Sequence, residues 1–83
     1  MKKYAIIGAL YFDSINGNTY HNTKIIDTET GATYYTGYKY GYGNAWEHSA
    51  DDYIERVLGV KDFSLIKCGA FRLNKKQVKN GNF

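Results

Sequence analysis

The chain has 83 residues, the size of one compact domain and too short for a multidomain enzyme. Hydrophobic residues make up 43% and charged residues 23%, near the globular average, so we expect the chain to fold as one domain, residues 1–83. Its single cysteine excludes an intramolecular disulfide, and its two histidines are too few for a zinc module. We therefore expect a cytoplasmic protein without a metal or cofactor.

The net charge is +3, and the two signs are unevenly distributed along the chain. All eight acidic residues lie between Asp13 and Asp62, and only cations follow them: Lys67, Arg72, Lys75, Lys76 and Lys79. A basic segment of this kind is typical of a contact with nucleic acid or with an acidic protein. Residues 75–83 are predicted to be a basic, flexible tail, and a merely solvated tail is the alternative interpretation.

The N-terminal half is predicted to form an antiparallel meander. Tyr4–Phe12 is apolar on both sides of a strand, which indicates the central strand of a sheet. The Asn-Gly pair within Asp13–Asn18 predicts a chain reversal, and Thr19–Thr28 is a second strand. After a turn at Thr30-Gly31, Ala32–Tyr40 is predicted to be a third strand, with one face formed by Ala32, Tyr34, Thr36, Tyr38 and Tyr40.

A helix is predicted to follow, with Asn44 as its N-cap, Glu47 in a capping box and Gly59 as its stop. One stripe of this helix is apolar, and its members are Trp46, Ala50, Tyr53, Ile54, Val57 and Leu58. Residues 63–73 resemble one more strand, interrupted at Gly69, and a short helix is the alternative for this mixed pattern. The expected fold class is α+β: an antiparallel sheet of three to four strands with one helix packed on one face, in the order β-β-β-α-β.

Tyrosine is the main compositional deviation, with nine residues in the chain. A small core cannot enclose nine phenols, so some of the rings must lie at the surface, where tyrosine is well suited to binding. The predicted partner-binding residues are Tyr35, Tyr38, Lys39, Tyr40, Tyr42 and Trp46. Two interpretations of Trp46 stay open: an anchor of the helix N-terminus beside Gly43, or the centre of a partner surface.

Catalytic residues are not predicted. His21 and His48 lie in no spacing that marks a known catalytic set, and Cys68 is expected in the core. The glycines of Gly41-Tyr42-Gly43-Asn44 can place backbone N–H groups around an anion, but a strand that turns into a capped helix explains them as well. We therefore expect a protein that is not an enzyme.

Two motifs carry a resemblance: Asn16-Gly17-Asn18-Thr19-Tyr20-His21, and Tyr40-Gly41-Tyr42-Gly43-Asn44. Together they resemble small uncharacterised proteins encoded by phages and mobile elements, over roughly Tyr4 to Leu58. The resemblance implies an accessory protein inside an infected bacterium that binds and inhibits a host defence protein or ribonucleoprotein complex, in the manner of an anti-CRISPR.

A direct nucleic-acid-binding module is the alternative function. In that hypothesis the C-terminal cations Lys67, Arg72, Lys75, Lys76 and Lys79 contact phosphates of RNA or DNA, and exposed tyrosines stack on bases. No membrane contact is expected, since no segment approaches the ~20 apolar residues of a membrane span. A homodimer is compatible with either function.

Overall fold

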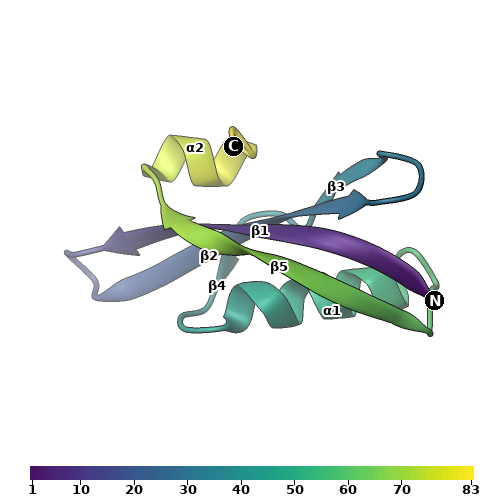
Figure 1. The fold of residues 1–83 in the computed structure, drawn as a ribbon. Coiled ribbons are helices and arrows are strands. Elements are labelled where there is room, and N and C mark those ends of the chain that lie inside the picture. Colours follow the sequence, from purple (N-terminus) through teal and green to yellow (C-terminus); the bar gives the residue numbers. More distant parts are fainter.

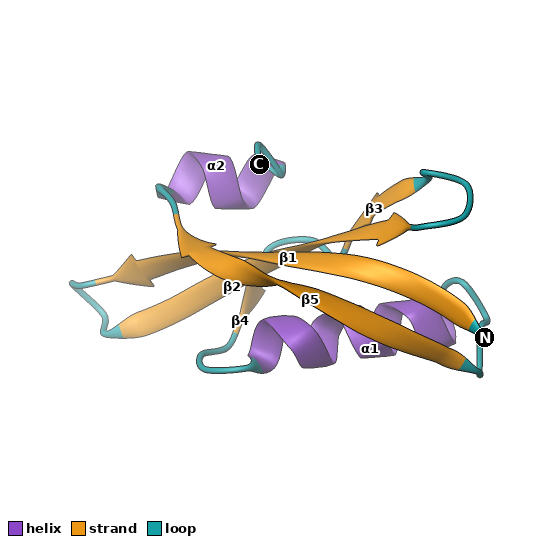
Figure 2. Ribbon diagram, in the orientation of Figure 1, coloured by secondary structure: helices purple, strands orange, loops and turns teal.

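The computed structural model describes all 83 residues and has an α+β fold (Figures 1 and 2). Five strands form one mixed sheet in the order β3-β2-β1-β5, with β4 also paired to β2. Neither helix is long and apolar enough to cross a membrane. The elements are β1 (Lys2–Asp13), β2 (Asn18–Asp27), β3 (Thr33–Tyr35), β4 (Lys39–Tyr40), α1 (Ala45–Arg56), β5 (Phe63–Arg72) and α2 (Lys75–Asn80).

Strand β1 is the central strand, as its two-sided apolar pattern predicts, and it forms an antiparallel hairpin with β2. The predicted reversal is confirmed, and the hairpin closes where Asp13 pairs with Asn18. The Asp13 carboxylate accepts hydrogen bonds from the backbone N–H of Ile15, at 3.0 Å, and from the side-chain amide of Asn16, at 2.9 Å. The aspartate before the Asn-Gly pair therefore fixes the loop, and with it the register of the hairpin.

Strand β5 lies parallel to β1, which corrects the prediction of an antiparallel sheet. A register shift interrupts the pairing: Ile6 lies opposite Lys67 and Ile7 opposite Gly69, so Cys68 is an extra, bulged residue. The predicted interruption at Gly69 is thus confirmed. The expectation of Cys68 in the core is wrong, because the bulge leaves it exposed at the sheet edge.

The predicted strand Ala32–Tyr40 is two short strands, β3 and β4. Between them Gly37 has a φ of +94°, a conformation that other residues rarely adopt and that breaks the extended chain. Tyr34 lies opposite Ile25, while Tyr40 lies opposite Tyr20. Odd and even residues of β2 point to opposite faces, so the expectation that Tyr34 and Tyr40 share a face is wrong.

Helix α1 packs on one face of the sheet and builds the main core there (Figure 1). The core consists of the buried residues Tyr4, Ile6, Ile25, Trp46, Ala50 and Ile54. The Trp46 ring lies directly over Gly8, where a Cβ atom would come within 2.6 Å of the indole. Trp46 is therefore a core residue, and its close neighbour is Gly8 rather than the predicted Gly43.

The ends of α1 differ from the prediction. Asn44 is the N-cap residue, but its side chain makes no capping hydrogen bond. The Glu47 carboxylate instead forms an ion pair with Lys67 of β5 at 2.8 Å, which attaches the helix to the sheet. The helix stops at Arg56, and of the stripe residues beyond it Val57 is 64% exposed while Leu58 still packs against the core.

Helix α2 lies on the opposite face of the sheet from α1 (Figure 1), so the expectation of a flexible tail over residues 75–83 is wrong. Its start is a capping box between Asn74 and Gln77, and it ends at Gly81, which has a φ of +71°. Val78 is fully buried, and the Asn22 side chain donates a hydrogen bond to its carbonyl at 2.9 Å.

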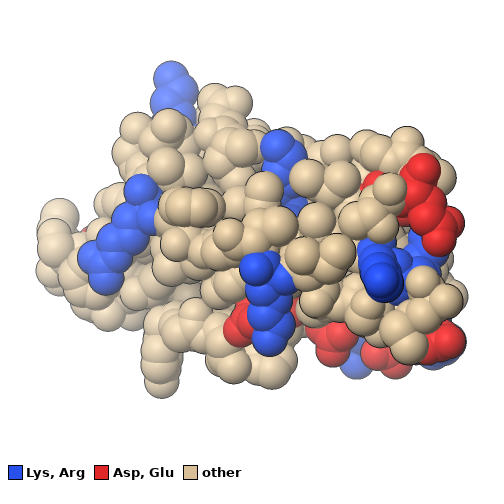
Figure 3. Space-filling view, viewed as in Figure 1, with Lys and Arg blue, Asp and Glu red and all other residues tan.

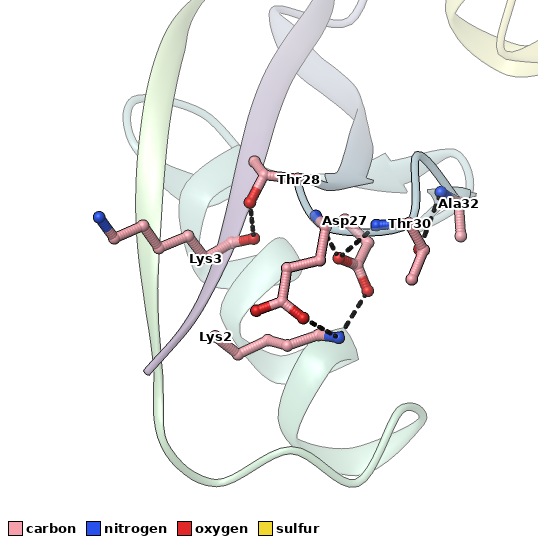
Figure 4. A network of polar contacts seen from close by, with 7 residues as sticks. Lys2, Lys3, Asp27, Thr28, Thr30 and Ala32 are labelled. Atoms are coloured by element: carbon pink, nitrogen blue, oxygen red, sulfur yellow. Dashed lines mark hydrogen bonds and ion pairs between the residues drawn. The ribbon is translucent and has the colours of Figure 1, made fainter.

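An ion-pair network closes the end of the sheet where the N-terminus lies (Figure 4). The Lys2 ammonium contacts the carboxylates of Asp27, at 2.9 Å, and Glu29, at 3.5 Å. Thr28 donates its hydroxyl to the carbonyl of Lys3. The hydrogen bond from Lys2, together with backbone N–H groups, holds the pKa of Asp27 below its usual range. The charges of Lys2, Asp27 and Glu29 therefore neutralise one another.

Candidate functional site

The far end of the sheet, near the β1–β2 loop, carries a group of tyrosines that we name the tyrosine cluster: Tyr11, Tyr20, Tyr38 and Tyr40. Strand pairing assembles it, because Tyr11 lies opposite Tyr20 and Tyr20 lies opposite Tyr40. The rings of Tyr20 and Tyr38 are stacked, 5.0 Å apart with planes 10° from parallel. Tyr40 meets Tyr20 edge to face at 5.8 Å. Both are favourable aromatic geometries, and they fix the rings relative to one another.

The cluster lies on the face of the sheet that carries α2. Asn22, which bonds to α2, and Tyr20 are even-numbered residues of β2 and therefore point to the same side. Burial raises the pKa of Tyr38, and the neighbouring Tyr20, Tyr11 and Asp13 raise it further. Tyr11, Tyr20 and Tyr38 are partly buried, while Tyr40 remains 62% exposed. Tyr42, two residues later, is 73% exposed.

The cations near the cluster have no acidic partners. The side chains in ion pairs with carboxylates are those of Lys2, Arg56, Lys61 and Lys67. Six other cations are exposed and form no ion pair: Lys3 at the N-terminal end of the sheet, and Lys39, Arg72, Lys75, Lys76 and Lys79. In Figure 3 the acidic side chains gather near the N-terminal end and along the side of α1, while the opposite end shows only basic ones.

Lys75 connects the cations to the tyrosines. Hydrogen bonds from Asn16 and Ile15 lower the pKa of Asp13, and the charge of Lys75 lowers it further. Asp13 in turn acts on Tyr38. The backbone gives the same placement: the N–H of Leu73, two residues before α2, donates to the carbonyl of Leu10 at 2.9 Å, next to Tyr11. The N-terminal end of α2 therefore borders the tyrosine cluster.

The predicted partner-binding residues do not form one surface. Tyr38 and Tyr40 belong to the cluster, with Tyr42 next in the chain, whereas Lys39 lies opposite His21 and points to the α1 face. Tyr35 lies apart from the cluster, because its ring packs edge to face against Phe83 at 5.7 Å. Trp46 is only 8% exposed and belongs to the core, so its interpretation as a partner anchor is wrong.

The predicted nucleic-acid contacts also divide. Lys67 is held by Glu47 at 2.8 Å, and this partner neutralises its charge. Arg72, Lys75, Lys76 and Lys79 are exposed and unpaired. The last three lie on a folded helix rather than on a tail, so their positions are fixed relative to the sheet.

His21 is the one titratable side chain buried beneath this region, at 2% exposure. Its Nδ1 lies 3.3 Å from the carbonyl oxygen of Gly41, and its Nε2 lies 2.6 Å from the Ser49 hydroxyl. A carbonyl only accepts, so Nδ1 donates to Gly41 and Nε2 accepts the hydroxyl of Ser49. Burial lowers the pKa of His21. In its neutral form, His21 of β2 therefore bonds to α1 through Ser49 and to the segment after β4 through Gly41.

Other chemistry finds little support in the geometry. The His21–Ser49 pair resembles a base and nucleophile, but burial disfavours the imidazolium that such a base must form. No three His, Cys, Asp or Glu side chains come together in an arrangement that could hold a metal ion. A shallow polar pocket lies between α1 and β5 and contains the Glu47–Lys67 ion pair; it is lined by Asn44, Glu47, His48, Asp51, Leu65 and Lys67.

The sequence reasoning missed Tyr11 and Tyr20 as members of the site. Their signal lies in the hairpin register, because the loop fixed by Asp13 brings these two strand residues opposite each other. Once that register is known, the alternation of side chains places both rings on one face.

No protein-family model, curated protein or solved structure matches this chain, so the fold and the chemistry of the tyrosine cluster rest on its own geometry.

Proposed function

We propose that this chain is a non-enzymatic binding protein that acts inside an infected bacterium by occupying a surface of a host defence nucleoprotein complex. The observation that carries the proposal is the tyrosine cluster, whose exposed ring of Tyr40 lies on the same face of the sheet as the unpaired cations of α2. Rigid aromatic side chains supply contact area at a low entropic cost, which is why they dominate the centres of binding surfaces.

The rigidity of the surface favours binding over catalysis. Tyr20 packs against both Tyr38 and Tyr40, so the rings are ordered before any partner arrives. A surface that is ordered in advance loses little conformational entropy when it binds. The nearby His21 is engaged in two structural contacts, which leaves no free base beside the rings.

The charge of the surface supports a partner that carries negative charge. Lys75, Lys76 and Lys79 lie together on α2 without an acidic residue among them. Such a surface cannot mimic the phosphate backbone of DNA, and it instead complements a nucleic acid or an acidic groove. The resemblance to phage and mobile-element proteins favours a defence complex of the CRISPR type or another as that partner.

Phage plaquing tests the proposal. Expression of the wild-type chain in a bacterium with an active defence system is expected to restore plaques, and the double variant Tyr40→Ala/Tyr42→Ala is expected to lose this effect. Val57→Ala is the matched control, because Val57 is also exposed, at 64%, but lies at the end of α1. Unchanged plaquing across the major defence systems would contradict the proposal.

A further inference from the structure

We infer that the tyrosine cluster and the cations of α2 form a site for single-stranded nucleic acid. The inference rests on the proposed function and names the ligand of the same surface: the unpaired strand that a nucleoprotein complex carries. Exposed aromatic rings for the bases and adjacent cations for the backbone are the two parts of such sites. Both parts are present here on one side of one sheet.

The first part is the stacking ring. Tyr40 is 62% exposed, and its ring contacts the ring of Tyr20, its neighbour across the strands, edge to face at 5.8 Å. Tyr20 is itself stacked on Tyr38, so the ring that fixes Tyr40 is also ordered. A base that stacks on Tyr40 therefore meets a ring that is already in place. Tyr42, at 73% exposure, offers a second ring two residues further along the chain.

The second part is the positive charge beside the rings. Lys75 and Lys76 begin α2, which lies on the tyrosine face, and both are exposed and free of ion pairs. Arg72 lies opposite Leu10 of β1 and points to the α1 face, so it does not belong to this site. Phosphates that contact Lys75 and Lys76 release condensed counterions, which makes the binding favourable and dependent on salt.

One acidic residue lies among these groups. The Asp13 carboxylate accepts hydrogen bonds from Ile15 and Asn16 in its own turn, and its pKa is lowered by them and by Lys75. It therefore stays charged and repels phosphate locally. Its single charge is outnumbered by Lys75, Lys76 and Lys79 of α2, and it directs the backbone toward α2 rather than over the β1–β2 loop.

Unpaired bases are required by this geometry. Bases in a duplex are already stacked on one another, and no long element of this fold projects from the tyrosine face to enter a groove, since α2 has only six residues. A single strand can turn its bases onto Tyr40 while its phosphates follow the cations. We therefore expect single strands to bind more tightly than a duplex of the same sequence.

Fluorescence anisotropy with a labelled 12-nucleotide oligothymidine or oligouridine measures this affinity. Wild-type protein is expected to bind both single strands, and Tyr40→Leu is expected to raise the Kd about tenfold, since it keeps an apolar side chain but removes the ring. Tyr40→Phe keeps the ring and is expected to restore the affinity to within about twofold of wild type. The melting temperature of each variant verifies that it is folded.

Salt dependence tests the cations separately. The double variant Lys75→Gln/Lys76→Gln is expected to lower the slope of log Kd against log salt by about 1.4, the value for two phosphate contacts on a single strand. Lys61→Gln is the control, because Lys61 is 80% exposed but pairs with Glu55 near the far end of α1. An unchanged slope in the double variant would contradict the assignment.

The outcomes separate this inference from the proposed function. If no oligonucleotide binds at low salt, or the duplex binds more tightly, the inference is overturned. If plaquing by the wild type still depends on Tyr40 and Tyr42 in that case, the surface binds a protein and the proposed function stands. If the oligonucleotide binds through Tyr40 but plaquing is unaffected by the wild type, the site stands and the defence complex is the wrong partner.

Discussion

The two faces of the sheet are built from the same strands but differ in how they are covered. On one face, the 12-residue helix α1 buries a continuous core that includes Tyr4, Ile6 and Trp46. On the other face, the six-residue helix α2 covers only a part, through the buried Val78. Phe71 of β5, opposite the buried Ala9, stays 57% exposed on this second face.

This difference assigns separate tasks to the two faces. The α1 face holds most of the buried apolar surface, and such burial is the dominant stabilising term of a small domain. The α2 face contributes less to stability, which leaves its tyrosines and cations free to meet a partner. Substitutions on the α1 face should therefore cost more stability than substitutions on the α2 face.

The largest effect is expected on the α1 face. Trp46→Ala removes the ring that packs on Gly8, and the free energy of unfolding should fall by about 3–5 kcal/mol, a large share of the stability of so small a domain. Urea denaturation followed by circular dichroism measures this change. A variant that melts like the wild type would mean that the core does not depend on α1.

A smaller effect is expected on the α2 face. Val78→Ala removes two buried methyl groups, which should reduce the free energy of unfolding by about 1–2 kcal/mol. The exposed neighbour Lys79 is the control, since Lys79→Ala should change stability by less than about 0.5 kcal/mol. A loss at Val78 as large as that at Trp46 would break the comparison, because both faces would then be core.

The pH dependence tests the contact of His21 with α1 and with the segment after β4. Burial lowers the pKa of His21 in the folded protein, so the folded state disfavours the protonated form. The free energy of unfolding should therefore be constant above neutral pH and fall as the pH drops below about 6.5, the ordinary value for histidine. Denaturation at pH 8 and pH 5 measures the fall, and His21→Gln should remove most of it. An equal fall in the variant would assign it to other groups.

The smallest effect on stability is expected at the tyrosine cluster. Tyr40→Leu should change the free energy of unfolding by only about 0.5–1 kcal/mol, since the side chain is 62% exposed and loses one edge-to-face contact. Thermal melting beside the wild type checks this. A loss comparable to that of Trp46→Ala would show that the ring is part of the fold rather than of a binding surface.

Local patterns predicted most of the elements. Three predictions are confirmed: a central strand from the two-sided apolar run of β1, a reversal at the Asn-Gly pair, and a helix buried through Trp46, Ala50 and Ile54. Helix α2 also carried a local signal: Asn74 and Gln77 have the spacing of a capping box, and Gly81 follows as a stop. Its short length and basic composition led instead to the prediction of a tail.

Features that depend on long-range pairing were not predictable from local patterns. The apolar pattern of β5 is the same in either direction, so its parallel pairing with β1 depends on the path of the chain across α1. The contact of Trp46 with Gly8 joins residues far apart in the sequence. The tyrosine cluster likewise depends on the register of two strand pairs and on the break at Gly37.

Chemical-shift mapping by two-dimensional NMR tests the division between the faces most directly. On titration with a 12-nucleotide oligothymidine, we expect the shifts to concentrate at Tyr11, Tyr20, Tyr38, Tyr40 and the start of α2, while the signals of the core residues Ile54 and Ala50 of α1 do not move. Shifts that concentrate on α1, or an unchanged spectrum at low salt, would show that the α2 face is not the binding surface.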